Sequence, residues 1–88
     1  MKYSVEYTPQ AVKTLRKLDA QTRRFILSWV EKNLVDCENP RLHGKGLTAN
    51  LSGKWRYRIG DYRLIADISD EKVLILILRI GHRSDIYT

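Results

Sequence analysis

The fold of this chain is decided by residues 54–69, which read KWRYRIGDYRLIADIS. Hydrophobic and polar residues alternate on both sides of Gly60-Asp61, and this period of two is typical of half-buried strands. Glycine in the first of two loop positions suits a type II′ turn, so the stretch is predicted to be a β-hairpin. Because a two-residue loop fixes the register, Arg58 should lie directly opposite Arg63.

This register gives the hairpin two faces of different chemistry. One face is apolar and should be covered by helices; it holds Trp55, Tyr57, Ile59, Tyr62, Leu64, Ala66 and Ile68. The other face should meet solvent and carries four cations, namely Lys54, Arg56, Arg58 and Arg63, beside Ile65 and Asp67. Like charges directly opposite each other destabilise a sheet. We interpret the cluster as an anion site, since arginine forks match phosphate oxygens; a solvated edge with splayed side chains is the alternative.

The flanking sequence adds two helices and two strands. Residues 2–7 alternate as a strand, Thr8-Pro9 has the form of a helix start, and Asp19 can cap a second helix. The apolar face of that second helix is expected to contain Phe25, Ile26, Trp29, Val30 and Leu34. A long connection over residues 36–53 leads to the hairpin, and residues 72–80 form the last strand. Residues 73–78 are apolar at every position, which predicts a central strand buried on both faces.

The order β-α-α-β-β-β predicts an α+β fold, with two N-terminal helices packed on one face of a mostly antiparallel sheet. With 88 residues, the chain is expected to form a single domain over residues 1–88. The longest apolar run has six residues, and a bilayer span needs about 20. The first ten residues lack a signal-peptide pattern, and the single Cys37 excludes an internal disulfide. We therefore expect a cytoplasmic protein without membrane association.

The net charge of +6 is concentrated in one segment. Residues 41–63 contain six basic residues and one acid, which leaves +5 there. Such a patch attracts polyanions, nucleic acid among them. The two histidines and Cys37 lack zinc-ligand spacing, and residues 43–46 (HGKG) lack the spacing of a phosphate-binding P-loop. No metal and no cofactor is therefore expected.

The C-terminal residues 81–88, GHRSDIYT, add Arg83, His82 and Tyr87 after the last strand. Together with residues 55–64 (WRYRIGDYRL), residues 80–87 (IGHRSDIY) resemble the RelE/ParE superfamily of bacterial toxin–antitoxin toxins, and the resemblance covers nearly the whole chain. It implies the same β-α-α-β-β-β order. It also implies a cleft between the connector, the basic strands and the C-terminal segment.

Within the superfamily the chain looks like the RelE branch. The basic positions of that branch are matched by Arg56, Arg58, Arg63 and Arg83, and its tyrosine by Tyr87. The resemblance implies a ribosome-dependent, metal-independent mRNA endoribonuclease that cleaves in the ribosomal A site through attack of the 2′-OH on the adjacent phosphate. The alternative is a ParE-like inhibitor of DNA gyrase on the same fold.

The expected roles divide between charge and proton transfer. Arg56, Arg63 and Arg83 suit charge neutralisation, and Arg41, Lys45 and Lys54 are expected to bind RNA. The best-known RelE pattern has lysines where this chain has Arg56 and Arg58, and arginine does not readily release a proton. The candidate proton-transfer groups are therefore, in order of preference, Tyr87, His82 and Lys54.

The resemblance also implies partners. A cognate RelB-like antitoxin, acidic and partly disordered, should neutralise the basic toxin. The substrate should be mRNA on the ribosome, and operator DNA should be bound only through the antitoxin complex.

Overall fold

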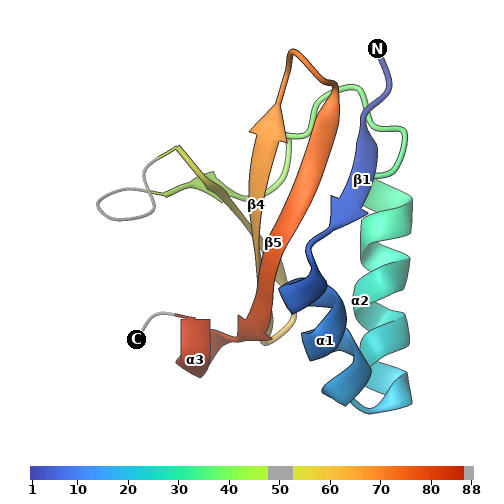
Figure 1. The fold of residues 1–88 in the computed structure, drawn as a ribbon, viewed down its shortest axis with the longest axis vertical. Helices are drawn as coiled ribbons and strands as arrows, with labels where there is room; N and C mark the ends of the chain where they lie inside the picture. Colours follow the sequence, from blue (N-terminus) through green and yellow to red (C-terminus); the bar gives the residue numbers. More distant parts are fainter. Residues whose placement is uncertain (48–52, 87–88) are drawn as a thin grey trace.

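The computed structural model describes residues 1–47 and 53–86. The elements, in chain order, are β1 (Ser4–Tyr7), α1 (Pro9–Lys17), α2 (Ala20–Asn33), β2 (Lys45–Gly46), β3 (Trp55–Ile59), β4 (Tyr62–Ser69), β5 (Leu74–His82) and α3 (Arg83–Ile86). The strands form one sheet in the order β1-β5-β4-β3-β2. β1 runs parallel to β5 and the other pairs are antiparallel, with α1 and α2 on the same side of the sheet (Figure 1). The predicted α+β fold is confirmed.

Both long helices begin as the sequence predicts. The Thr8 hydroxyl accepts a hydrogen bond from the backbone N–H of Ala11 at 3.2 Å, and Pro9 opens α1. The Asp19 carboxylate accepts one from the N–H of Thr22 at 3.0 Å. Each cap satisfies a backbone donor that the first turn of a helix leaves without a partner. The two caps set the sharp corner between the helices and so direct both onto the sheet.

The core lies between the helices and one face of the sheet. Its largest fully buried side chains are Tyr57, Ile26, Leu34, Ile59, Leu64, Ile75, Ile77 and Val30. Phe25 was expected among them, and this expectation is wrong because its side chain is 56% exposed. Its ring lies against the turn between β3 and β4, where a Cβ added at Gly60 would be 3.3 Å away. A glycine turn offers little surface to cover an aromatic ring, so Phe25 remains largely in solvent.

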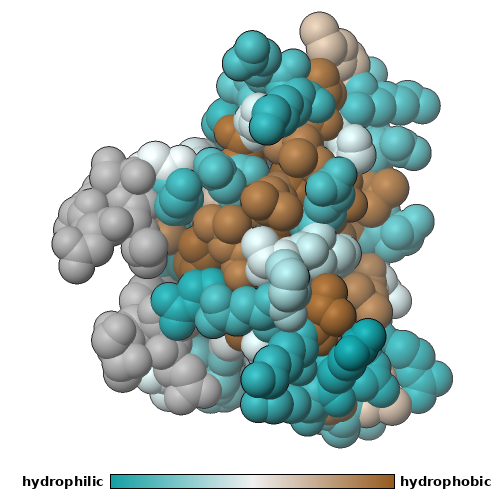
Figure 2. All heavy atoms as spheres, viewed as in Figure 1, coloured by the Kyte–Doolittle hydropathy of each residue, from teal (hydrophilic) through white to brown (hydrophobic). Residues whose placement is uncertain are grey.

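β5 is buried on one face only, so the expectation of burial on both faces is wrong. Its core side chains are Ile75, Ile77 and Ile80, whereas Leu74, Leu76 and Leu78 are only half-buried. The central strand is β4. The reason is that α1 and α2 cover the same face of the sheet, which leaves the other face, here called the open face, more accessible. Figure 2 shows hydrophobic side chains over β4 and β5 in this view.

The connector between α2 and β3 is held down by hydrogen bonds from two aromatic side chains. Trp55 Nε1 donates to the carbonyl oxygen of His43 at 2.7 Å, and the buried Tyr57 hydroxyl donates to that of Pro40 at 2.5 Å. The end of the connector forms the two-residue strand β2, which pairs Lys45 with Arg56. A strand this short has no period to detect, so the sequence predicted irregular structure here.

Gly44 is expected to be essential for this close approach. Its φ is +82°, and a Cβ there would overlap the backbone carbonyl of Arg56. Gly53 has a similar φ of +89° but open space around it, which makes it the matched control. We expect Gly53→Ala to lower the free energy of unfolding by about 1 kcal/mol, because its backbone is in the left-handed region. Gly44→Ala should lower the free energy of unfolding clearly further, as measured by urea denaturation; equal losses would contradict the close packing.

Asp70 should make the fold sensitive to acid. Hydrogen bonds from Arg41 Nη1 (3.0 Å) and from the Tyr3 hydroxyl (2.6 Å) lower the pKa of the Asp70 carboxyl. Because the folded-state pKa lies below the ordinary value, the ionised form stabilises the fold above that ordinary value. This contribution is lost as the pH falls through the lowered folded-state pKa. In urea unfolding between pH 7 and pH 3, Asp70→Asn should lose less stability than wild type, while Glu71→Gln should behave like wild type.

Candidate functional site

The open face of the hairpin brings the predicted arginines together. β3 pairs with β4 so that Arg58 lies opposite Arg63 and Arg56 lies opposite Ile65, which confirms the predicted register. Of the alternate residues of the two strands, Tyr57, Ile59, Leu64 and Ala66 are fully buried beneath the helices. Because side chains alternate along a strand, the three arginines project from the open face. We call this group, with Arg83, the arginine cluster.

Arg63 differs from the expectation that it faces solvent, because it is only 7% exposed. Its Nη1 donates to the carbonyl oxygens of Gly60 at 3.2 Å and Tyr62 at 3.1 Å. The guanidinium therefore folds back over the turn that precedes it, where a tight loop leaves carbonyl oxygens free to accept. Its buried Nε has no hydrogen-bond partner among residues 1–47 and 53–86.

The electrostatic environment of Arg63 shows how closely the cations lie. Burial lowers the pKa of the Arg63 guanidinium, and the positive charges of Arg58, Arg56 and Arg83 lower it further, partly opposed by Asp61. Arginine nevertheless stays protonated near neutral pH. Four repelling cations with one neighbouring acid make this part of the open face strongly attractive to an anion, above all to a phosphodiester that accepts several forked hydrogen bonds.

The turn between β3 and β4 also positions the start of the C-terminal segment. The backbone N–H of Arg83 donates to the carbonyl oxygen of Asp61 at 2.8 Å. Arg83 is exposed at the first residue of α3, directly beyond β5. One turn thus holds the guanidinium of Arg63 and the backbone of Arg83. Tyr87, the preferred proton-transfer residue, lies outside the described residues.

His82 lies on the other side of the sheet from the arginine cluster. It pairs with Tyr62 across β4 and β5, and the two rings meet edge to face with centroids 5.6 Å apart. Its Nδ1 is 2.9 Å from the Ser84 hydroxyl and accepts from the Ser84 N–H at 3.3 Å. Tyr62 shares its face with the buried Leu64, two residues along β4. The structure therefore does not place His82 with the three hairpin arginines.

The three predicted RNA-binding residues have different surroundings. Lys45 is exposed and lies beside Arg56 across β2 and β3. Lys54 Nζ is 3.4 Å from the Asp67 carboxylate, which directs its ammonium toward that acid. Arg41 pairs with Asp70, which follows the end of β4 remote from Arg63. At about 3.3 Å per residue, the seven residues from Arg63 to Asp70 span roughly 23 Å along the strand, so Arg41 lies well away from Arg63.

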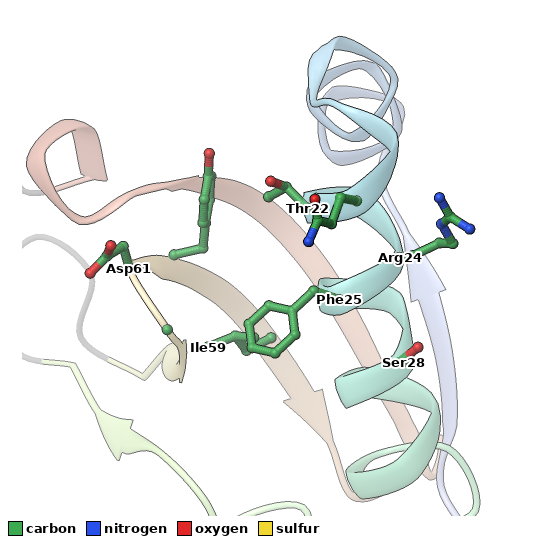
Figure 3. Close-up of a pocket in the computed structure, with 9 residues that line it drawn as sticks. Thr22, Arg24, Phe25, Ser28, Ile59 and Asp61 are labelled. Carbon is green, nitrogen blue, oxygen red and sulfur yellow. The ribbon is translucent and has the colours of Figure 1, made fainter.

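A separate hollow of about 570 Å³ lies on the helical side of the same turn. Figure 3 shows the Phe25 ring from α2 beside Ile59, with Asp61 at the tip of the turn and Arg24 extending away from the hollow. Its lining is mostly apolar and it gathers no cluster of basic side chains. The hollow therefore differs in chemistry from the arginine cluster.

The described part of the chain offers neither a metal-binding cluster nor a membrane-spanning helix. Residues 1–47 and 53–86 contain no group of three or more histidine, cysteine, aspartate or glutamate side chains placed to hold a metal ion. None of the helices described is both long and apolar enough to cross a membrane.

Known proteins resemble this chain over nearly its full length. A family model described as the ParE toxin of the type II toxin–antitoxin system parDE matches residues 5–87. Toxin RelG of Mycobacterium tuberculosis is 39% identical over 88 residues, which cover 99% of this chain and 98% of that protein. The mRNA interferase toxin RelE of Escherichia coli is 30% identical over 92 residues, covering 100% and 93%. A chain of the toxin–antitoxin complex RelBE2 from M. tuberculosis superposes with a TM-score of 0.85 at 33% identity, covering 97% and 95%.

Proposed function

Because this chain belongs to the ParE toxin family of type II toxin–antitoxin systems and is a RelE- and RelG-like toxin, we propose that it cleaves mRNA in the ribosomal A site. The observation that carries the proposal is the arginine cluster on the open face. Arg63 stays buried there although Arg58, Arg56 and Arg83 repel it. A folded chain gains nothing from such repulsion, so an anionic ligand is the best explanation of the arrangement.

The proposed reaction requires RNA. The 2′-OH of one ribose gives its proton to a base as its oxygen attacks the adjacent phosphorus, the bond to the 5′ oxygen breaks, and the leaving oxygen takes up a proton. The product strand ends in a 2′,3′-cyclic phosphate. The pentacoordinate transition state gains negative charge on its phosphoryl oxygens, which Arg56, Arg63 and Arg83 can stabilise without a metal ion. DNA lacks the 2′-OH, so this route is closed to it.

We expect free RNA to be a poor substrate. The cluster binds phosphate strongly, but Arg58 and Arg83 are exposed on long side chains and give little control over a flexible strand. The A site presents a codon already ordered. The test compares the cleavage rate of one defined mRNA when it is free and when it is bound to programmed ribosomes. Both reactions use a cytoplasmic extract, since we expect the toxin to act in the cytoplasm. Equal rates with and without ribosomes would contradict this proposal.

The proposed partner is an acidic, RelB-like antitoxin. Its support is that some solved relatives, RelBE2 of M. tuberculosis among them, are toxin–antitoxin complexes. In addition, this chain carries a net charge of +6 and has half-buried leucines on its open face. An acidic segment with apolar residues could cover both features as it folds on binding. Operator DNA would then be bound through the antitoxin.

The second candidate is inhibition of DNA gyrase, and the observation in its favour is the match to the ParE family model. The two functions are separated by adding the purified chain to gyrase and supercoiled plasmid, and in parallel to a translation extract. Shortened mRNA with unaffected plasmid supports the nuclease. Trapped gyrase-cleaved plasmid with intact mRNA supports the inhibitor.

A further inference from the structure

A β-bulge in β5 changes which residues of that strand reach the open face. Along β4 and β5 the register runs from Ala66 opposite Ile77 to Ile65 opposite Arg79, so Leu78 is an extra residue without a partner. Ile77 belongs to the core. Without the extra residue, Arg79 would follow Ile77 onto the helical side, because side chains two apart share a face. The bulge instead turns Arg79 onto the open face, as bulges near functional sites commonly do.

The first turn of α1 holds this bulge in place. The Thr8 hydroxyl donates to the carbonyl oxygen of Leu78 at 2.8 Å while it accepts from the N–H of Ala11. The Thr8 N–H donates to the carbonyl oxygen of Ile77 at 3.0 Å. A carbonyl displaced from a ladder by a bulge needs a new donor. Thr8 supplies it, and α1 starts beside this part of β5 (Figure 1).

Arg79 thereby joins a row that crosses three strands. Arg56 on β3, Ile65 on β4 and Arg79 on β5 lie in register, with the two arginines about 10 Å apart at their Cα atoms for strands spaced about 4.8 Å. Ile65 is 2% exposed although it lies outside the helix-covered core, as expected if flanking arginine stems cover it. The Arg79 side chain is exposed and forms no hydrogen bond or ion pair within residues 1–47 and 53–86.

We propose that Arg79 binds the RNA backbone and, with Arg56, forms a phosphate subsite beside the Arg58–Arg63 pair. The proposal rests on the proposed function in that its ligand is a single strand of RNA. Arg79 would contact a phosphodiester next to the one that is cleaved. It thus extends the binding surface from β3 and β4 onto β5. Thr8 is a positioning residue for this contact, since it holds the bulge that orients Arg79.

The test uses binding and does not depend on cleavage. The probe is a fluorescent single-stranded RNA with 2′-O-methyl riboses, which cannot be cleaved by attack of a 2′-OH. Its Kd is measured by anisotropy over a range of NaCl concentrations for the full chain. One lost phosphate contact should reduce the slope of log K against log salt by about 0.7 for Arg79→Gln. Arg16→Gln, which removes an equal charge from an exposed position of α1, is the matched control and should leave the slope unchanged.

The role of Thr8 is tested by a double-mutant cycle. Thr8→Val, which removes the hydroxyl, should reduce the salt slope by part of the amount seen for Arg79→Gln. Thr8→Ser, which keeps the hydroxyl, should have the wild-type slope. In the Arg79→Gln background, Thr8→Val should reduce the slope no further. Circular dichroism of each variant shows whether it is folded.

Three results would overturn the subsite: no binding of the probe by wild type, a wild-type slope for Arg79→Gln, or an equal reduction by Arg16→Gln. A further reduction by Thr8→Val in the Arg79→Gln background would overturn the positioning role. If wild type fails to cleave mRNA on ribosomes but Arg79→Gln still reduces the slope, the proposed nuclease is wrong and the subsite stands.

Discussion

Arg63→Met is expected to slow mRNA cleavage on programmed ribosomes by about 10²–10³-fold, the usual loss when one preorganised transition-state donor is removed. Methionine keeps the unbranched stem and removes the charge. Nη1 bonds to Gly60 and Tyr62 and Nε is buried, which leaves the two N–H groups of Nη2 for phosphate oxygens. Arg63→Glu, which reverses the charge, should abolish toxicity. Single-turnover cleavage and growth after induction measure the two effects.

The stability of these variants separates a functional from a structural role. Each of the two hydrogen bonds lost from the charged group contributes about 1.5–3 kcal/mol to the free energy of unfolding. Relief of the repulsion from Arg58, Arg56 and Arg83 offsets part of this loss. We therefore expect Arg63→Met to remain folded by circular dichroism. Arg63→Lys, which keeps the charge but loses the fork, should retain intermediate activity, and Arg16→Met should retain full activity. A variant that unfolds at room temperature would show that Arg63 mainly supports the hairpin.

The second large effect is expected at Tyr87. A tyrosine phenol can carry a proton, and a general acid or base contributes about 10²–10⁴-fold. Tyr87→Phe should therefore cost about 10²-fold or more in single-turnover cleavage on ribosomes. In the pH–rate profile, the part in which the rate changes with ionisation of the Tyr87 phenol should disappear in Tyr87→Phe.

The matched comparisons for Tyr87 are His82→Gln and Lys54→Met. Because His82 packs on Tyr62 and bonds to Ser84, and Lys54 pairs with Asp67, each loss should stay below about threefold, too small for a general acid or base. A larger loss for either one than for Tyr87→Phe would move the proton-transfer role to that residue. If all three stay below this threshold, the arginine cluster carries the reaction by charge and alignment alone.

The hairpin register could be predicted from the sequence because a two-residue turn leaves no freedom in the pairing of its strands. Gly60 has the positive φ of 57° that the predicted turn needs, and Arg58 faces Arg63 as expected. The helix caps at Thr8 and Asp19 could also be predicted, because each depends only on residues within one helical turn. The prediction that Phe25 belongs to the core was wrong. Helical spacing gives the direction of a side chain around the helix axis, but it does not show how far the sheet that covers the helix extends.

The bulge at Leu78 could not be predicted for a related reason. Register is visible in a sequence only when hydrophobic and polar residues alternate, since a slip by one residue then exposes apolar side chains. Residues 73–78 are apolar throughout, so an extra residue leaves no trace. Arg79 was missed as a consequence. The burial of Arg63 depends on the carbonyl oxygens of the adjacent turn, which residue types alone do not reveal.

The parallel pairing of β1 with β5 constrains when this chain can fold during its own synthesis. The hydrogen bond from Thr8 to Leu78 joins residues 70 apart, and within residues 1–47 and 53–86 the only strand that pairs with β1 is β5, which ends at His82. Pairing between strands so far apart in the sequence forms late in folding, because the intervening chain must lose conformational entropy before the contact forms. An incomplete nascent chain therefore cannot close the sheet. Arg83 follows β5 directly, so the arginine cluster can assemble only after β5 has been synthesised, and a chain truncated before this point lacks the site.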